Sequence, residues 1–344
     1  MKLLIVGSNR HYAIENEYEA ALTQYCEVSI YPIHVYFEDR YNRSILHKLW
    51  YKLSLNTFVW SLNKLFLDEV SVIQPDVIWV FKGMEILPNT LIELKRRGTI
   101  LLNYNADHPI EYTYPGSGNI LVKKGIPHYH HHFSYSLKIV NDLNKQFNIS
   151  ASWLPFAVKN QGQKLSGNEQ LINKVCFIGN PDKIRADTVK FLLYNDIPVD
   201  VYGNDWDNFI NNHNLLTINY AIYGEEFNCL IQKYKAVLNI FRPHNENSHN
   251  MRTFEIPAAG GVQLAPYSEE HKLLFKENDT IFLFHNLDEL LKNAQKFINA
   301  SDGEIREIQQ RSFAKMTMGE NDYAKRAEQV FTTIKQLKTK SIKI

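Results

Sequence analysis

The stretch from Asn245 to Val262 carries the residue types that a phosphate- and ribose-binding site needs. An amide-rich loop leads into a short helix with Arg252 and Glu255, and a glycine pair precedes the next apolar run. Backbone amides at a helix start, together with Arg252, can neutralise two phosphates without a metal ion. Glu255 suits a different task, since a carboxylate can accept hydrogen bonds from both hydroxyls of a ribose. A capped surface helix with an ion pair and a Gly-Gly turn explains the same residues.

Polar residues also follow the buried runs in the first half of the chain. Because the carboxyl ends of parallel strands share one edge of a sheet, we expect these side chains to lie close together. Asp107 and His108 are candidate acid–base groups for an acceptor hydroxyl, although a loop-capping Asp before a turn fits equally. Lys82 can contact an anionic acceptor or the donor phosphates. The candidate acceptor or cleft residues are Gly7, Asn9, Lys82 and Asn105.

These residues need a scaffold, and the chain supplies short apolar runs that alternate with helical patterns, as in parallel sheets built from βαβ units. The expected strands of the first half are Leu3–Val6, Glu27–Tyr31, Val77–Phe81, Thr99–Tyr104 and His132–Tyr135. Those of the second half are Val175–Ile178, Val199–Tyr202, Ala236–Ile240, Val262–Ala265 and Ile281–Phe284. The sequence therefore predicts an α/β protein with two Rossmann-like domains.

The domain boundary is expected after residue 155. The segment Ser150–Ala157 and the polar stretch Lys159–Asn173, which has no hydrophobic period, are interpreted as the linker. From Asn321 onward the apolar residues form one helical stripe. We predict an N-terminal domain over 1–155, a C-terminal domain over 156–320, and a helix over 321–344 that crosses back to the first domain.

Composition and charge limit the classes of function. The 38 Lys and Arg against 37 Asp and Glu give a net charge of +1, so no overall field draws the protein to nucleic acid or anionic lipid. Three widely spaced cysteines do not make a disulfide framework. The apolar run after Met1 is too short for a signal-peptide core. We expect a cytoplasmic protein, with the inner face of the membrane as an alternative.

The segment Ile45–Phe66 interleaves aromatic and aliphatic residues with lysines. A helix of this kind can touch a membrane surface, but a helix docked on the sheet has the same pattern and is the favoured interpretation.

The run His128–His132 invites a metal interpretation. Adjacent strand residues point to opposite faces and no acidic partner lies at ligand spacing, so we do not expect a metal site there. The expected strands also have no DxD pair of the sort that holds a metal-bound diphosphate. No metal and no cofactor are expected.

The core Asn250–Gly261 resembles the signature of the GT-B glycosyltransferases of the spore-maturation type, within the glycosyltransferase group 1 superfamily. That signature consists of an Arg, a Phe-Glu, an Ala and a Gly pair, and the match covers about twelve residues. Weaker similarity extends over most of residues 75 to 335. The resemblance implies a GT-B fold, in which a nucleotide diphosphate sugar binds mainly the C-terminal domain at the interdomain cleft and the acceptor enters from the N-terminal domain.

Carried over to this chain, the resemblance gives Glu255 the donor ribose and Arg252 the diphosphate. Gly260 and Gly261 would let the backbone approach the diphosphate, and Gly179 would open a second phosphate-facing loop. Tyr202 and Gly203, at the carboxyl end of a strand, would face the base. The complete set of predicted donor-binding residues is Gly179, Arg185, Tyr202, Gly203, Asn250, Arg252, Thr253, Glu255, Gly260 and Gly261.

One departure concerns the stereochemistry of transfer. Retaining relatives often carry a glutamate eight positions before the ribose-binding one, and that position is Asn247 here, beside Glu246. Either residue can hydrogen-bond the transferred sugar, so retention is favoured only weakly.

The predicted activity is transfer of a sugar, with a UDP-sugar favoured as the donor, to a glycan, lipid-linked or other hydroxyl acceptor. A noncatalytic or epimerase-type relative and a nucleic-acid-modifying glycosyltransferase stay open as alternatives.

Overall fold

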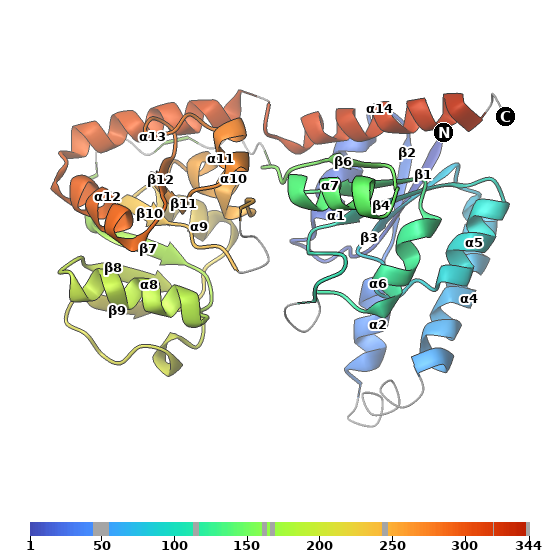
Figure 1. Ribbon diagram of the computed structural model, residues 1–344, viewed down its shortest axis with the longest axis horizontal. Coiled ribbons are helices and arrows are strands. Elements are labelled where there is room, and N and C mark those ends of the chain that lie inside the picture. The colour runs from blue at the N-terminus through green and yellow to red at the C-terminus, as the bar shows by residue number, and fades with distance from the viewer. Residues whose placement is uncertain are drawn as a thin grey trace. The chain divides into compact units, whose positions relative to one another are not determined.

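The computed structural model describes residues 1–43, 55–112, 117–159, 164–165, 169–242, 247–318 and 320–341. The chain divides into two compact units. Unit 1 contains Met1–Pro155 and Tyr323–Ile344, and unit 2 contains Phe156–Asp322. Helices cover the sheet of each unit, as Figure 1 shows for the two units separately.

Unit 1 is built on a parallel sheet of six strands in the order β2-β1-β3-β4-β5-β6. The strands are β1 (Lys2–Val6), β2 (Glu27–Tyr31), β3 (Val77–Phe81), β4 (Ile100–Asn105), β5 (His131–Ser134) and β6 (Ala151–Trp153). Strands β3 and β4 are buried along their whole length, as expected of central strands covered on both faces.

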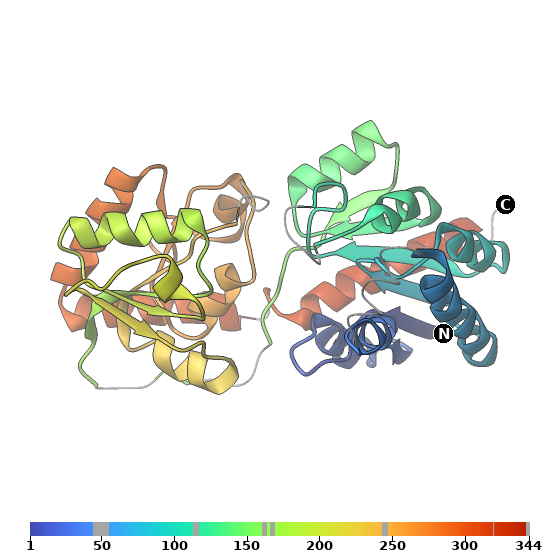
Figure 2. The same ribbon diagram turned by 90° about the horizontal axis from the view of Figure 1, so that it is seen from below.

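The helices of unit 1 follow the strands in alternation. They are α1 (Ile14–Leu22), α2 (Ile33–Tyr41), α4 (Leu55–Ile73), α5 (Pro88–Arg96), α6 (Ile120–Gly125), the 3-10 turn η1 (Ile126–His128), α7 (Leu137–Gln146) and α14 (Tyr323–Ser341). The C-terminal helix α14, red in Figure 2, packs on α1, with Tyr25 stacked on Phe331 at 4.7 Å between ring centroids.

Helix α4 contains the second half of the segment Ile45–Phe66, which was considered for contact with a membrane. Residues 44–54 of that segment lie outside the described residues. The described part packs on the sheet through Phe66 and Val70, which share a core cluster with residues of β1 and β3, and leaves Trp60 and Leu65 exposed. The described part of the segment is therefore a helix packed on the sheet, as the favoured interpretation has it. Contact with a membrane stays a prediction.

Unit 2 repeats the architecture with the strand order β12-β11-β10-β7-β8-β9, again parallel throughout. The strands are β7 (Ile172–Ile178), β8 (Val199–Tyr202), β9 (Leu216–Asn219), β10 (Tyr234–Leu238), β11 (Gln263–Pro266) and β12 (Phe282–Phe284). The helices are α8 (Lys183–Tyr194), η2 (Trp206–Asn208), α9 (Gly224–Ile231), α10 (Arg252–Ala258), α11 (Glu269–Leu274), α12 (Leu287–Asn299) and α13 (Asp302–Thr317).

Local sequence explains where several helices of unit 2 begin. The side chains of Asp182, Ser268 and Asn286 accept backbone N–H groups in the first turns of α8, α11 and α12. Ser301 and Glu304 form a reciprocal capping box at the start of α13.

All ten predicted strands are present, and the predicted GT-B arrangement of two Rossmann-like sheets is confirmed. Two strands were missed. Residues 151–153, interpreted as the start of a linker, form β6, and β9 was not predicted.

Candidate donor site

The strand order of unit 2 marks one position on its sheet. Strands β7, β8 and β9 follow one another in one direction and β10, β11 and β12 in the other, so the order reverses between β7 and β10. In open parallel sheets, ligands bind beyond the carboxyl ends of the strands at such a reversal. The residues that follow β7 and β10 are therefore the first place to search.

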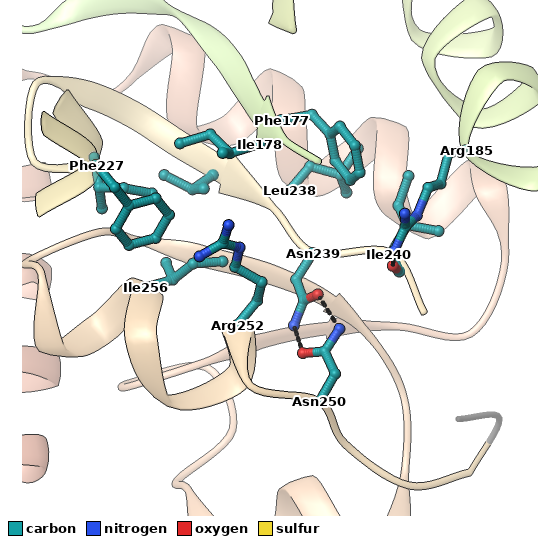
Figure 3. A pocket seen from close by; sticks show the side chains of 12 residues that line it. Phe177, Ile178, Arg185, Phe227, Leu238, Asn239, Ile240, Asn250, Arg252 and Ile256 are labelled. Carbon is teal, nitrogen blue, oxygen red and sulfur yellow. Dashed lines mark hydrogen bonds between the residues drawn. The ribbon is translucent and has the colours of Figure 1, made fainter. Parts of the chain in front are cut away.

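A small enclosed pocket lies at this reversal point, at the ends of β7 and β10 (Figure 3). Its volume is about 20 Å³, which is room for about one water molecule. A nucleotide would therefore have to lie across the mouth of the pocket or displace side chains that now fill it. Its lining residues are Phe177, Ile178, Arg185, Phe227, Ile231, Val237, Leu238, Asn239, Ile240, Asn250, Arg252 and Ile256.

Arg185 enters the pocket from the first turn of α8. Its side chain is 12% exposed, so it is not an ordinary solvated cation on a helix surface. The guanidinium donates to the carbonyls of Asn180 at 2.9 Å and Ile240 at 3.3 Å, while Nε has no hydrogen-bond partner among the described residues. The pKa of Arg185 is lowered to about 10, chiefly by burial and to a smaller extent by the positive charges of Arg242 and Arg252, while the carboxylate of Asp182, 3.5 Å from Nε, opposes the shift. A buried, partly satisfied cation of this kind favours an anionic ligand.

Arg252 enters the same pocket from the opposite side, at the start of α10. Its guanidinium lies over the ring of Phe227, 4.3 Å from the centroid, and Nη1 is 2.6 Å from Oε2 of Glu255. Arg252 and Glu255 are each about 30% exposed, so a ligand can reach both. Because Glu255 is already paired, binding a ribose requires the carboxylate to share or release Arg252.

Amide side chains form the floor of the pocket. Asn239, after β10, and Asn250, before α10, exchange two hydrogen bonds of 2.8 and 3.0 Å (Figure 3). Asn250 Oδ1 also accepts the N–H of Thr253 at 3.0 Å, which fixes the start of α10. Asn250 lines the pocket, whereas Thr253 is fully buried, and the predicted contacts of both residues with the donor stay predictions.

The glycine pair lies in closely packed surroundings. A Cβ atom on Gly261 would lie 2.5 Å from Ile231 Cγ2 and 2.7 Å from Ile256 Cγ2, and a Cβ atom on Gly260 would overlap Leu165. Gly260 has a φ of +81°, which glycine adopts without strain. Close packing of the unit's own side chains therefore explains both glycines, and their predicted approach to a diphosphate stays a prediction.

Gly179 and Gly203 let the loops after β7 and β8 touch. A Cβ atom on Gly203 would lie 2.8 Å from the carbonyl carbon of Gly179 and 3.0 Å from Trp206 Nε1. The indole N–H of Trp206 donates to Gly179 O at 3.0 Å. These glycines hold the loop that leads to Arg185, while their predicted contacts with the donor stay predictions.

Tyr202 does not point freely toward a base. Its hydroxyl lies 2.8 Å from that of Tyr234, which donates to Asp200 at 2.7 Å, and Lys174 donates to the other oxygen of Asp200 at 2.7 Å. This hydrogen-bonded chain holds the Tyr202 hydroxyl against the sheet, and the predicted contact of Tyr202 with the base stays a prediction.

Asn247 is exposed and has a φ of +60°, a left-handed conformation that Asn tolerates better than most residues. Glu246 lies outside the described residues.

In unit 1 the strand order reverses between β1 and β3, and the predicted acceptor residues follow these two strands and β4. Lys82 Nζ is 2.6 Å from Oδ2 of the buried Asp107. Asn105 Oδ1 accepts the N–H of Asp107 at 2.9 Å, while its buried Nδ2 has no hydrogen-bond partner among the described residues. The structure therefore brings Lys82, Asn105 and Asp107 together.

His108 uses one ring nitrogen within its own loop. Its Nδ1 accepts the backbone N–H groups of Glu111 at 2.9 Å and Ile110 at 3.2 Å, so this ring nitrogen is the deprotonated one. Burial lowers the pKa of His108, which keeps the ring neutral. The predicted acid–base role of His108 stays a prediction.

The sequence prediction missed Glu15, at the start of α1. Its buried carboxylate accepts the N–H of Ser8 at 2.8 Å, and burial raises its pKa. Gly7 is required here, since a Cβ atom on it would lie 2.5 Å from Glu15 Oε1. Asn9 follows in the same loop and is exposed.

A second missed pair is His34 and Glu85. His34 Nδ1 donates to Glu85 Oε1 at 2.7 Å, which raises the pKa of His34. The only feature of the sequence that could have indicated Glu15 is its position eight residues after Gly7. No feature of the sequence indicated that His34 and Glu85 form a pair.

Histidines of the run His128–His132 form hydrogen bonds within unit 1. His131 contacts the hydroxyls of Ser150 and Ser152 at 2.8 Å, and His132 Nε2 donates to Ile126 O at 2.9 Å. Burial lowers the pKa of each to about 4. Within the described residues, no group of three His, Cys, Asp or Glu side chains is arranged to hold a metal ion.

Part of the chain is similar in sequence to a known protein family. Residues 185–332, which include most of α8, all of α10 and both pocket arginines, match the sequence family described as glycosyl transferase-like. The match covers most of unit 2 and the start of α14. No curated protein sequence matches the chain at a significant level.

Solved structures with the same fold cover nearly the whole chain. Sucrose-phosphate synthase from Thermosynechococcus elongatus is 10% identical, with a TM-score of 0.70 over 98% of this chain and 99% of its own. The Anabaena protein HepE, in complex with UDP-glucose, is 11% identical, with a TM-score of 0.63 over 98% of this chain and 100% of its own. A suggested UDP-N-acetylglucosamine 2-epimerase from Listeria monocytogenes is 13% identical, with a TM-score of 0.61 over 98% of this chain and 97% of its own.

The resemblance to GT-B glycosyltransferases of group 1 is confirmed. Across the described helices, none is long and apolar enough to span a membrane.

Proposed function

We propose that this glycosyl transferase-like protein moves a sugar from a nucleoside diphosphate sugar, with a UDP-sugar favoured, to a hydroxyl group of an acceptor such as a glycan. The observation that carries this proposal is the pair Arg185 and Arg252, which enter one pocket at the strand-order reversal of unit 2. Bidentate guanidinium groups suit phosphate oxygens, and their charge stabilises the diphosphate as it leaves.

Donor binding is proposed to rearrange the pair Arg252–Glu255. The diphosphate competes for the guanidinium, which now lies on Phe227 and against Glu255. The released carboxylate of Glu255 then accepts hydrogen bonds from the ribose hydroxyls. This exchange would enlarge a pocket that is too small for a nucleotide.

A bound metal ion is not part of the proposal. The task that a divalent cation performs for a diphosphate, neutralising charge as the bond to the sugar breaks, falls here to Arg185 and Arg252, with Arg242 near enough to lower the pKa of Arg185.

An uncharged hydroxyl acceptor fits unit 1 better than an anionic one. The Lys82 ammonium is paired with Asp107, and its charge also acts on the buried Glu15. The predicted contact of Lys82 with an anion would have to compete with both carboxylates. The buried Nδ2 of Asn105 and the carboxylate of Asp107 offer a donor and an acceptor, which is the combination that a hydroxyl needs.

Transfer with retention of configuration is proposed for two reasons. An inverting reaction needs a base for the acceptor proton, and the basic nitrogen of His108, one of the two predicted bases, is occupied. A retaining front-face reaction can pass this proton to the departing phosphate. Asn247, exposed and eight positions before Glu255, is proposed to hold the transferred sugar.

The test uses proton NMR of the full chain with UDP-glucose or UDP-N-acetylglucosamine in EDTA, with and without a panel of neutral glycosides. We expect UDP release with a sugar product that first appears as the α-anomer. Release of the β-anomer would contradict retention, and loss of all turnover in EDTA would contradict metal independence. Conversion of the sugar to its C2 epimer, with no glycoside formed, would favour the epimerase alternative.

A further inference from the structure

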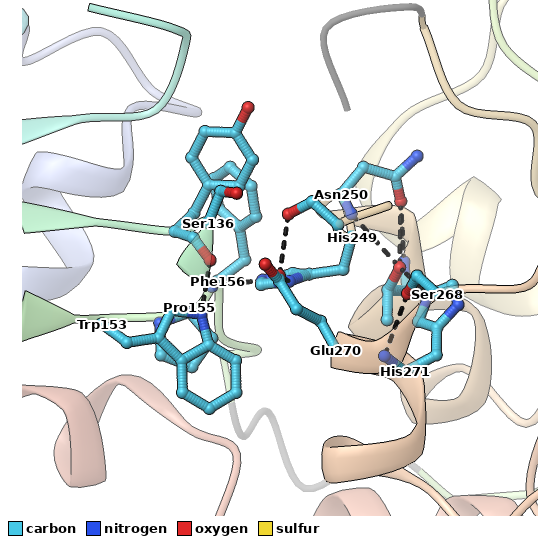
Figure 4. Close-up of polar contacts among 12 residues, drawn as sticks. Ser136, Trp153, Pro155, Phe156, His249, Asn250, Ser268, Glu270 and His271 are labelled. Atoms are coloured by element: carbon cyan, nitrogen blue, oxygen red, sulfur yellow. Dashed lines mark hydrogen bonds and ion pairs between the residues drawn. The ribbon is translucent and has the colours of Figure 1, made fainter. Parts of the chain in front are cut away.

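A buried polar cluster lies directly behind the loop and helix that carry the proposed donor site. It is centred on Glu270 and His271, neighbouring residues of α11 that are 2% and 0% exposed. Glu270 Oε2 accepts the hydroxyl of Ser248 at 2.7 Å and the Nδ1–H of His249 at 2.6 Å (Figure 4). One carboxylate therefore holds two consecutive residues of the segment that leads into α10.

The hydrogen-bond pattern excludes a nucleophilic role for this cluster. Ser, His and Glu are the residue types of a hydrolase triad, but in a triad the serine hydroxyl donates to the histidine. Here Ser248 donates to the carboxylate, and His249 Nε2 accepts the backbone N–H of Phe156 at 3.3 Å. Both ring nitrogens of His249 are engaged, so the imidazole cannot take a proton from Ser248.

His271 fixes the first turn of α10 through Thr253. Its Nδ1–H donates to Pro266 O at 3.1 Å, and its Nε2 accepts the hydroxyl of Thr253 at 3.0 Å. Burial lowers the pKa of His271 to about 3, so the ring stays neutral and keeps this pattern. Thr253 in turn bonds to Asn250, which pairs with Asn239 in the pocket.

Two adjacent residues of one short helix thus anchor both the loop 247–250 and the first turn of α10. Burying a carboxylate is costly, and an apolar side chain of similar volume often gives equal or greater stability. A buried charge with two matched donors does, however, fix one conformation of the segment that supplies those donors. That segment leads directly to Arg252.

We infer that Glu270 and His271 are positioning residues of the donor site, which hold the segment from Asn247 to Thr253 so that Arg252 is directed into the pocket. This inference rests on the proposed function. Neither residue lines the pocket, so their effect on a ligand must pass through Arg252 and the loop.

The test is a double-mutant cycle in ligand affinity. UDP, GDP, ADP and dTDP are titrated into the wild type, Glu270→Gln, Arg252→Gln and the double variant, at a temperature where circular dichroism shows each to be folded. Glu270→Gln keeps the shape of the side chain and removes its charge. Glu269→Gln, on the exposed side of the same helix, is the matched control and should bind like the wild type.

We expect Arg252→Gln to weaken binding of the preferred diphosphate about tenfold in the wild type and less than threefold when Glu270 is already Gln, because the two substitutions remove one interaction. Ser248→Ala, which deletes one donor to Glu270 with little risk to the fold, should weaken binding about two- to threefold.

Full additivity of the two losses, or unchanged affinity in both Glu270→Gln and Ser248→Ala, would overturn the positioning role while leaving the proposed function intact. Failure of the wild type to bind any of the four diphosphates would overturn the proposed function, and this inference with it.

Discussion

Arg252 and Glu255 lie one turn apart on α10, with Arg252 Nη1 2.6 Å from Glu255 Oε2. The residue proposed for the diphosphate and the residue proposed for the ribose therefore neutralise each other until a donor arrives. Pairs at this spacing on an exposed helix contribute little to stability, about 0.3–0.5 kcal/mol, so their exchange for ligand contacts costs little.

Glu255→Ala should abolish discrimination between UDP and 2′-deoxy-UDP. The wild type is expected to prefer the ribonucleotide by roughly tenfold, about 1.4 kcal/mol, and the variant by less than about twofold. The ratio is the informative quantity, because removing Glu255 also frees Arg252 and can tighten diphosphate binding. Glu307→Ala, an exposed carboxylate on α13, is the control, and an undiminished preference in Glu255→Ala would exclude the ribose role.

Gly203→Ala should destabilise unit 2 by roughly 2 kcal/mol, because the new methyl group overlaps the backbone of Gly179 and neither loop can move without breaking the contact with Trp206. Gly303→Ala, at a helical position with open space, should be neutral or stabilising by up to about 1 kcal/mol. Urea denaturation of both variants measures the difference. Equal stability of the two would show that the loops after β7 and β8 do not need this close approach.

Glu15→Gln should stabilise the protein as the pH rises. Burial raises the pKa of Glu15 in the folded state, so the unfolded chain binds fewer protons above the ordinary range of a Glu, and ionisation disfavours folding there. Below about pH 4 the carboxyl is protonated in both states and the advantage disappears. Thermal melts at pH 4 and pH 7 should show a gain of about 2–4 °C only at the higher pH, roughly 1 kcal/mol.

Glu17→Gln, on the same helix outside the buried core, should show no such pH-dependent gain. A gain for Glu15→Gln that is equal at both pH values would mean that burial of the charge is not its cause.

The parallel strands were predictable because each central strand is a run of apolar residues bounded by polar loops, as in Val77–Phe81. Strands β6 and β9 were not predicted. Both lie at sheet edges and are only half-buried, so Ala151–Trp153 and Leu216–Asn219 have no continuous apolar run. Edge strands give a weaker sequence signal than central ones.

The site was predictable where residues lie close in sequence and unpredictable where the partner is distant. Arg252 and Glu255 share one helix turn, whereas Gly261 packs on Ile231 and Thr253 bonds to His271. These partners occupy the space around Gly261 and the hydrogen bonds of Thr253, which the sequence alone does not reveal. The sequence also does not show that Arg185 lies buried beside Phe177 and Ile240, which makes it a pocket residue.

The central claim is that Arg185 and the strand-order reversal of unit 2 form a diphosphate site. Calorimetric titration of UDP in EDTA should be carried out on the wild type, on Arg185→Gln, and on Lys183→Gln, an exposed lysine of the same helix. We predict EDTA-insensitive binding that falls at least tenfold, about 1.4 kcal/mol or more, in Arg185→Gln and is unchanged in Lys183→Gln. Equal affinity of the wild type and a folded Arg185→Gln would contradict the account.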